Sequence, residues 1–223
     1  MTLATPSLSP VVIPRRLRLA CKRVIDVVVA GSLLSFGAPI HLGAGLLVLI
    51  YDGRPIFYRQ RRAGVDGKEF ELLKLRTMQV HSTPASAQGQ VGLEHPLLTR
   101  SGRILRRFKV DELPQLVSVL RGDMSLVGPR PALVEQAQAY DEEQRRRLTM
   151  RPGLTGWAQV NGNVTLSWPQ RILLDLWYID HWSLGLDLAI LARTVGVILG
   201  GEHPDPRALE RAEEHAHRSR RRG

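Results

Sequence analysis

The sequence has one cysteine, Cys21, among its 223 residues. A single thiol excludes an internal disulfide framework and any zinc or iron–sulfur site that needs several thiolates. The Walker loop, the Rossmann glycine fingerprint, the His-Glu-x-x-His zinc motif and the Gly-x-Ser-x-Gly elbow are also absent. Any chemistry must therefore depend on residues outside these standard motifs.

Acidic residues are few relative to basic ones: 21 Asp and Glu against 31 Lys and Arg give a net charge of +10. Hydrophobic residues make up 43% of the chain, and the mean hydropathy is −0.11. This excludes a disordered basic protein, because such chains lack the apolar residues that form a core. The length allows one domain plus a short accessory segment. The charge predicts an anionic partner, which composition leaves open as nucleic acid, an acidic membrane surface or phosphorylated substrates.

One long apolar segment runs from Val24 to Tyr51, with basic residues on both sides. It exceeds the roughly 20 apolar residues that cross a bilayer as one helix. Pro39 predicts a break near Ala38, because proline removes a helical hydrogen bond. Positive charge at both ends favours a helix-break-helix that enters and leaves a membrane by the same face. A spanning helix and a buried core helix are the alternatives, the latter weakened by the near absence of a polar face.

The segment that follows has the pattern of a globular domain. Two partly alternating runs, residues 55–62 and 68–78, surround Asp66-Gly67 and predict a β-hairpin. Residues 82–96 are rich in Ser, Pro, Gly and Gln and predict a mobile loop.

The rest of the chain has mainly helical spacing. Two helices are predicted to meet around Asp111, and a third, mostly polar helix is predicted over about 132–148. Asn161-Gly162 predicts a tight turn. Residues 202–223 are charged and arginine-rich, which predicts a solvated or membrane-surface tail.

The four tryptophans all lie in the C-terminal third of the chain. Tryptophan favours the headgroup level of a bilayer, which predicts an interfacial platform; an ordinary aromatic core is the alternative. The four residues are Trp157, Trp168, Trp177 and Trp182.

Adjacent carboxylates at Asp111 and Glu112 lie among several cations, including Arg106 and Arg130. Pro114 follows closely, so helix capping by Asp111 is the structural interpretation. The functional interpretation is phosphoryl transfer. A helix start and nearby cations would keep Asp111 ionised and attract phosphates, and the two carboxylates could hold Mg²⁺. An aspartate can also attack phosphorus to form an acyl phosphate.

Two loops shaped by proline and glycine each carry an arginine. Gly128-Pro-Arg-Pro131 would hold Arg130 on a stiff turn aimed at an anion. Arg151-Pro-Gly-Leu-Thr-Gly156 repeats the arrangement and could wrap a nucleotide diphosphate. Both loops are also compatible with plain connecting turns.

These stretches together resemble the bacterial sugar transferase family, the monotopic phosphoglycosyl transferases that load a sugar phosphate onto a polyprenyl phosphate carrier. The matching stretches run in order over about residues 20–199. They are Lys22-Arg23-x-x-Asp26, Pro55-Ile-Phe-Tyr-Arg-Gln-x-Arg62, Phe70-x-Leu-x-Lys74-Leu-Arg-Thr-Met78, Asp111-Glu-Leu-Pro-Gln-Leu116, Gly122-Asp-Met-Ser-Leu-Val-Gly-Pro-Arg-Pro131, Arg151-Pro-Gly-Leu-Thr-Gly-Trp-Ala-Gln-Val160 and Asp175-Leu-Trp-Tyr178.

The resemblance implies a reaction and residue roles. Asp111 would attack the β-phosphate of a UDP-sugar, releasing UMP and leaving a phosphosugar on the enzyme, before transfer to polyprenyl (undecaprenyl) phosphate. Glu112 would complete the dyad and, with Asp111, hold Mg²⁺ or handle the proton of the acceptor. The cations that the resemblance assigns to substrate phosphates are Arg106, Arg130 and Lys74; Arg151 joins them from its loop.

The expected fold is α+β and mostly helical: a re-entrant membrane hairpin bent at Pro39, and a small globular domain with a β-hairpin and interfacial amphipathic helices. Many members of the family have Ser before the proline where this chain has Ala38, so a hydroxyl hydrogen bond at the bend is absent. The expected division is a basic N-terminal segment 1–22, the membrane hairpin 23–51, a cytoplasmic phosphoglycosyl transferase domain 52–201 and a charged tail 202–223.

The resemblance further implies a monotopic protein on the cytoplasmic face of the bacterial inner membrane. It would act in the first membrane step of exopolysaccharide, O-antigen or glycoconjugate synthesis. Three alternatives stay open: a membrane-anchored nucleic-acid-binding protein, a scaffold for polysaccharide machinery, and direct attack by the acceptor with the dyad serving only Mg²⁺. Nucleic acid is the least favoured anionic partner, because no RNA-stacking motif or helix-turn-helix is present. Homo-oligomer formation is also left open.

Overall fold

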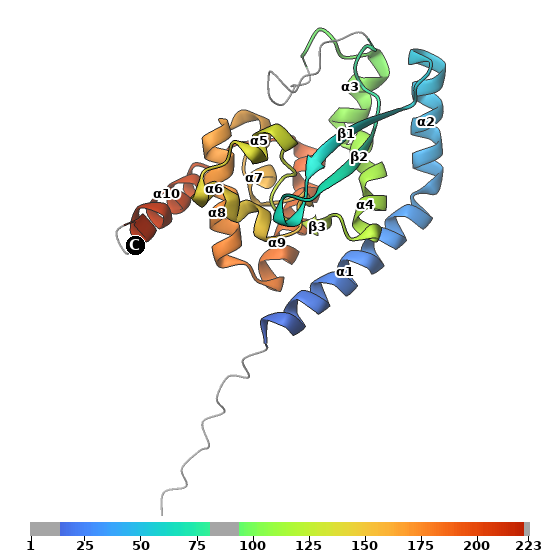
Figure 1. Cartoon of the computed structure of the whole chain (residues 1–223). Helices are drawn as coiled ribbons and strands as arrows, with labels where there is room; N and C mark the ends of the chain where they lie inside the picture. The colour runs from blue at the N-terminus through green and yellow to red at the C-terminus, as the bar shows by residue number, and fades with distance from the viewer. Residues whose placement is uncertain (1–13, 81–93, 221–223) are drawn as a thin grey trace, which may run out of the picture.

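The computed structural model of the chain describes residues 14–80 and 94–220. Two helices, α1 (Arg15–Phe36) and α2 (Ala38–Asp52), form a bent N-terminal pair beside a mostly helical body with two small two-stranded sheets (Figure 1). This confirms the expected mostly helical α+β class. The loop predicted over residues 82–96 lies mainly outside the described residues.

The break between α1 and α2 falls at Gly37, close to the expected position. Pro39 is the second residue of α2, a first-turn position in which its missing N–H is tolerated. The axes of α1 and α2 differ by 61°. The imidazole Nδ1 of His41 lies 2.6 Å from the carbonyl oxygen of Gly37. The bend therefore has a side-chain hydrogen bond, although Ala38 cannot supply one.

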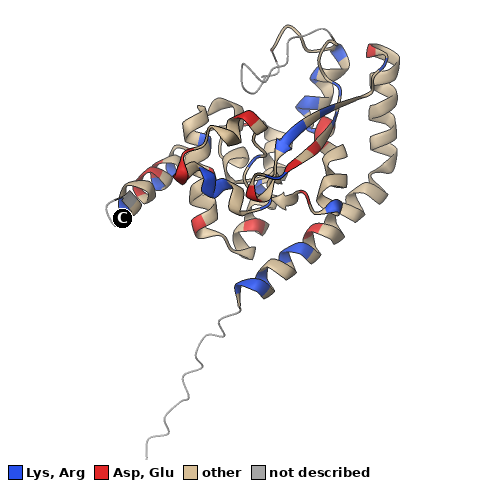
Figure 2. Ribbon diagram, in the orientation of Figure 1, with Lys and Arg blue, Asp and Glu red and all other residues tan. Residues whose placement is uncertain are grey.

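The bent pair is the one part of the described chain with the length and composition of a membrane segment. No single helix within residues 14–80 and 94–220 is long and apolar enough to cross a membrane, but α1 and α2 together meet both requirements. Near the bend, Phe36 is 87% exposed and Leu42 is 75% exposed. Asp52 is the only Asp, Glu, Lys or Arg of α2, whereas the first turns of α1 carry several cations (Figure 2).

Buried ionic contacts join α1 to the body. The Lys22 ammonium donates to Asp187 at 2.7 Å and to the carbonyl oxygen of Val127 at 2.8 Å. Asp187 also accepts hydrogen bonds from the Tyr178 hydroxyl at 2.6 Å and the Trp182 indole at 3.1 Å. These contacts link α1 to strand β3 (Ser125–Val127) and to helices α8 (Trp168–His181) and α9 (Leu184–Gly200).

The far end of α2 is tied to the same body. Arg76 donates to the backbone carbonyls of Asp52, Gly53 and Arg54 at the C-terminus of α2. The Asp52 carboxylate in turn accepts a hydrogen bond from the Thr99 hydroxyl at 2.9 Å. Both ends of the bent pair are therefore attached to one globular unit.

The predicted hairpin is present. Strands β1 (Phe57–Ala63) and β2 (Glu69–Leu75) pair antiparallel, with Tyr58 opposite Lys74, around a 3₁₀ turn η1 (Val65–Gly67). The second sheet pairs β3 in parallel with β4 (Gly153–Thr155). Its backbones approach closely, since a Cβ on Gly153 would lie 2.1 Å from the nitrogen of Gly128.

Short helices connect these sheets. The helices expected around Asp111 are α3 (Arg100–Arg107), the 3₁₀ helix η3 (Val110–Gln115) and α4 (Leu116–Arg121). The single helix predicted over 132–148 is wrong, because Asp141 accepts a hydrogen bond from the Gln144 N–H and starts a new helix. The chain there forms α5 (Val134–Gln138), α6 (Glu142–Arg145) and the 3₁₀ helix η4 (Arg146–Thr149), and later α7 (Trp157–Val160), η5 (Asn163–Thr165) and α10 (Pro206–Arg220). Asn161-Gly162 does form the turn between α7 and η5.

The tryptophans belong to an aromatic core, not to an exposed platform. Trp157 and Trp182 are buried, and Trp157 stacks on Trp177 with ring centroids 5.0 Å apart. The segment predicted to be a solvated tail also packs on the body, because α10 contacts α8 and buries Ala208 and Ala212.

We expect Asp187→Ala to lower the free energy of unfolding by about 3–5 kcal/mol, because it leaves the Lys22 ammonium buried without its counter-ion. Urea unfolding of the purified protein in detergent measures this. The control is Glu71→Ala, which removes an exposed ion pair with Arg59 and is expected to cost less than about 1 kcal/mol. Equal effects of the two substitutions would contradict this role for Asp187.

Candidate active site

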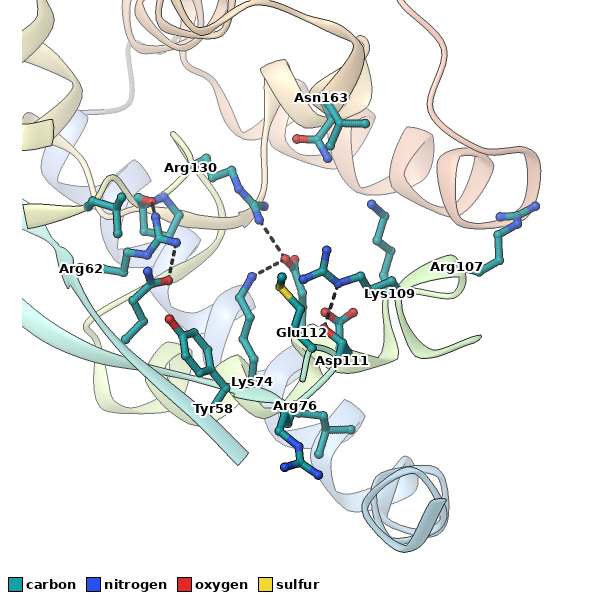
Figure 3. Close-up of a pocket in the computed structure, with 18 of the residues that line it drawn as sticks. Tyr58, Arg62, Lys74, Arg76, Arg107, Lys109, Asp111, Glu112, Arg130 and Asn163 are labelled. Carbon is teal, nitrogen blue, oxygen red and sulfur yellow. Dashed lines mark hydrogen bonds and ion pairs between the residues drawn. The ribbon is translucent and has the colours of Figure 1, made fainter. Parts of the chain in front are cut away.

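A cleft of about 690 Å³ lies against the β1–β2 hairpin, η3 and the C-terminal end of α9 (Figure 3). Its size is in the range of sites that hold small-molecule ligands. Asp111, Glu112, Lys74, Arg106 and Arg130 all line it. The structure thus brings together five of the six residues selected as catalytic or phosphate-binding.

The local backbone carries the two carboxylates into the cleft. Lys109 has a left-handed conformation, with φ of 58°, and separates α3 from η3. Asp111 and Glu112 then occupy the first turn of η3. The capping interpretation of Asp111 is wrong, because Lys109 holds the N-cap position and no side chain caps this helix.

Glu112 is clamped by two cations from different parts of the chain. Its Oε1 accepts hydrogen bonds from Lys74 Nζ at 2.8 Å, on β2, and from Arg130 Nη2 at 2.9 Å, after β3. Burial favours the neutral acid, but the charges of Arg130 and Lys74 and the hydrogen bonds they donate hold the pKa of Glu112 well below its usual range. Glu112 is therefore an ionised group in a fixed position.

Asp111 has a different environment. It is buried, and within the described part of the chain its carboxylate has no hydrogen bond or ion pair. Burial, followed by the adjacent Glu112 charge, raises the pKa of Asp111 above its usual value, against the opposing charges of Lys74, Arg106 and Lys109. The sequence predicts that nearby cations keep Asp111 ionised, but in the structure the cations lower the pKa of Glu112 instead. Of the two carboxylates, Asp111 is the one without a hydrogen-bonding partner among the described residues.

Neighbouring contacts place the two arginines. Arg106 donates from Nε to the Thr77 hydroxyl at 2.9 Å. The backbone at Arg130 is held by Arg147, whose guanidinium donates to the Arg130 carbonyl at 3.2 Å and pairs with the buried Asp175 at 2.6 Å. The buried pair of Arg147 and Asp175 thus positions the loop that carries Arg130.

Arg151 is not brought to the cleft. Its side chain is exposed and donates from Nε to the carbonyl oxygen of Gly122 at 2.9 Å. Its loop resembles the one that carries Arg130, and the two loops meet, since the Gly153 N–H donates to the Pro129 carbonyl oxygen at 2.8 Å. Of the two arginines, only Arg130 is among the described residues that line the cleft. The sequence shows the shared loop chemistry but not which arginine faces the cleft.

Several cleft residues were not selected from the sequence. In the sequence, Lys109 is one of several cations that flank the dyad, and Glu202 belongs to the segment predicted to be a tail. Asn163 is buried beside them and donates to Glu202 at 2.7 Å. Among the residues that the structure describes, eight cationic side chains and three carboxylates line the cleft: Arg62, Lys74, Arg76, Arg106, Arg107, Lys109, Arg130, Arg171, Asp111, Glu112 and Glu202.

The carboxylate pair fits a magnesium ion in donor type. Described residues contain no cluster of three or more His, Cys, Asp or Glu side chains able to enclose a metal. Mg²⁺ typically uses one or two carboxylates and completes its shell with water and substrate phosphates. Asp111 has no hydrogen bond to any residue that the structure describes, so its oxygens suit such a partial shell.

Residues 17–201 of the chain match the bacterial sugar transferase family. A relative from Bacillus subtilis, named an uncharacterized sugar transferase EpsL, is 44% identical over 181 residues, 81% of this chain and 88% of the relative. A Caulobacter vibrioides protein named UDP-glucose:undecaprenyl-phosphate glucose-1-phosphate transferase is 47% identical over 80% of this chain and 69% of its own. An exopolysaccharide production protein ExoY of Sinorhizobium fredii is 37% identical over 79% of this chain and 84% of its own.

The family match covers nearly all of the described chain, including the hairpin, the dyad and the loop of Arg130. Identities of 37–47% over about four fifths of the chain agree with it. The resemblance inferred from the motifs is confirmed, and this chain belongs to the bacterial sugar transferase family.

Proposed function

We propose that this protein transfers a sugar 1-phosphate from a UDP-sugar to undecaprenyl phosphate and releases UMP. The observation that carries the proposal is the contrast within the dyad: Asp111 has no hydrogen-bonding partner among the described residues, while Lys74 and Arg130 clamp Glu112 beside it. The names of the relatives support the same reaction class. The excess of cations in the cleft suits two substrates that both carry phosphates.

In the first step, an Asp111 oxygen attacks the β-phosphorus of the UDP-sugar. A new bond forms between oxygen and phosphorus, and the bond from that phosphorus to the bridging oxygen breaks. The electron pair leaves with UMP, and the sugar phosphate remains on Asp111 as an acyl phosphate. Arg106 and Arg130, which line the cleft with Asp111, would offset the negative charge that accumulates on the phosphate oxygens.

In the second step, a phosphate oxygen of the acceptor attacks the same phosphorus. The acyl phosphate bond breaks, Asp111 recovers its carboxylate, and the sugar becomes linked through a diphosphate to the lipid. Glu112 is a poor base, because Arg130 and Lys74 hold its pKa low. We therefore assign Glu112 to holding these two cations in place, not to accepting a proton.

We also propose Mg²⁺ as the cofactor, held by Asp111 and Glu112 together with the substrate phosphates. A bound Mg²⁺ would neutralise phosphate charge and orient the diphosphate. Only one Glu112 oxygen is used by Lys74 and Arg130, which leaves the other for such a contact.

The bent pair of α1 and α2 supports a monotopic protein on the cytoplasmic face of the inner membrane. Both ends of the pair are tied to the same globular body, through Lys22 and through Arg76. Both ends must therefore lie on one side of any membrane that the bend enters. The basic residues that flank the pair favour the cytoplasmic side. On this basis, exopolysaccharide or a related glycoconjugate is the proposed pathway, in line with the relative named for exopolysaccharide production.

With Mg²⁺, a UDP-sugar and no acceptor, we expect the protein to exchange labelled UMP into the UDP-sugar, because a covalent intermediate lets the first step run backwards. Asp111→Asn should reduce this exchange by at least about 10³-fold, since an amide cannot form the acyl phosphate. Asp123→Asn, at a carboxylate outside the cleft lining, is the matched control and should exchange normally. Turnover with acceptor but no exchange without it would favour direct attack and remove the nucleophile role.

Substitution of the two loop arginines should separate their roles. Arg130→Met removes a charged hydrogen bond to Glu112 and a phosphate partner, so we expect UMP release to fall by about 10²-fold or more. Arg151→Met should stay within about twofold of the unsubstituted protein, because its side chain lies outside the cleft. Steady-state UMP release from a UDP-sugar measures both. A large loss for Arg151→Met would reverse the assignment.

Cysteine labelling tests the one-sided topology. In a Cys21→Ser background, Arg16→Cys and Arg54→Cys place single thiols at the two ends of the bent pair, at exposed positions. An impermeant maleimide should label both in inverted vesicles and neither in intact spheroplasts. Phe36→Cys, near the bend, should be protected in both. Labelling of the two end positions from opposite sides would contradict the re-entrant arrangement.

A further inference from the structure

Glu202 reaches the cleft from just beyond the end of α9. Gly201 has a φ of 98°, a left-handed value that glycine adopts readily, and the chain reverses there. The Glu202 carboxylate then accepts hydrogen bonds from Lys109 Nζ, from Asn163 Nδ2 at 2.7 Å and from the Val164 backbone N–H at 3.3 Å. Its side chain is only 12% exposed.

The contact to Lys109 has a direct relation to the dyad. Lys109 lies two residues before Asp111, and its side chain extends toward Asn163 across the cleft from Lys74 (Figure 3). A lysine side chain is flexible, with a strongly hydrated ammonium group, so its position needs a partner. Glu202 supplies that partner from a segment far away in the sequence.

A carboxylate in this cleft requires an explanation. Among the described residues that line the cleft, Glu202 is the only Asp or Glu outside the dyad. Its negative charge opposes the binding of phosphorylated substrates unless it improves the placement of a cation. The ion pair with Lys109 provides such a gain.

The rest of the C-terminal segment fixes Glu202 in place. The backbone N–H of Asp205 donates to the carbonyl of Asn161 at 3.1 Å, and Ala208 and Ala212 of α10 are buried against the body. The family match ends at residue 201. The segment from 202 onward therefore contributes a side chain to the cleft from outside the matched region.

We propose that Glu202 is a positioning residue of the active site, which acts through Lys109 by holding its ammonium group where it meets the diphosphate of the nucleotide sugar. The role rests on the proposed transferase reaction. In this role the C-terminal segment contributes to substrate binding as well as to packing.

A double-mutant cycle tests this role. Glu202→Gln keeps the side-chain shape and an oxygen for Asn163 but removes the charge that holds Lys109. We expect kcat/KM for UMP release to fall about tenfold, the size expected for one charge-assisted contact. In a Lys109→Gln background the same substitution should change kcat/KM by less than about twofold, because its target is gone. Glu202→Asp should restore part of the activity.

A control separates positioning from folding. Asp205→Ala removes the hydrogen bonds that Asp205 accepts at the start of α10 and leaves the cleft side chains unchanged. It should lower the Tm while kcat/KM stays within about twofold, whereas Glu202→Gln should leave the Tm unchanged. Equal losses from Glu202→Gln in both Lys109 backgrounds, or an equal loss from Asp205→Ala, would overturn the proposal.

A measurement that does not depend on catalysis distinguishes the proposal for Glu202 from the proposed transferase reaction. A carbodiimide that joins contacting amines and carboxylates should link Lys109 to Glu202 in the purified protein, as seen by peptide mass spectrometry. The pair of Lys74 and Glu112 is the reference. A reference link without the Lys109 link would overturn the Glu202 role. A Lys109 link in a protein that releases no UMP from any UDP-sugar would leave the contact established and overturn the transferase proposal.

Discussion

The buried pair between Lys22 and Asp187 is the interaction on which the arrangement of this molecule depends. It lies where the N-terminal helix meets the globular body, and both partners are nearly excluded from solvent. An ion pair of this kind contributes little net stability against an apolar alternative, but the loss of one partner is costly. Its directional contacts to the Val127 carbonyl, Tyr178 and Trp182 fix how α1 meets the sheet and α9. The bent pair thereby acquires a defined position relative to the cleft.

Ion pairs also organise the cleft. Among the described lining residues, Glu112 and Glu202 are paired with cations, whereas Asp111 is unpaired. Glu112 and Glu202 organise the ammonium groups of Lys74 and Lys109 on two sides of the site. Asp111 is the exception, and its burial beside a second negative charge makes it the more basic carboxylate of the dyad.

Local chemistry made part of this structure predictable from sequence. The hairpin followed from alternation around Asp66-Gly67, the bend from Pro39, and the dyad from adjacent acids among cations. Those signals act over a few residues, so they are visible in a single chain. The prediction of one polar helix over 132–148 is wrong for a related reason. An aspartate in a polar stretch can lie on the surface of a helix or cap the start of a new one, and Asp141 caps α6.

Long-range placement could not be predicted in this way. Arg130 and Arg151 lie on similar loops that meet in the structure, and contacts with distant residues distinguish them: Arg147 holds the backbone at Arg130, whereas the Arg151 side chain donates to the Gly122 carbonyl oxygen. Glu202 looked like one more charge in a polar tail until the reversal at Gly201 carried it inward. Neither event leaves a pattern within a short window of sequence, since each depends on contacts between segments far apart in the chain.

The attachment of both ends of the bent helix pair to one globular body has a consequence for the way the proposed lipid acceptor would be reached. A helix with free ends can tilt or slide to match the thickness of the surrounding bilayer. In the proposed re-entrant arrangement, the angle at Gly37 and the two attachment points would set the insertion depth from within the protein. In that arrangement the height of Asp111 above the lipid would be a property of the fold, and bilayers of different thickness would present the headgroup of the proposed acceptor at the same level relative to this carboxylate.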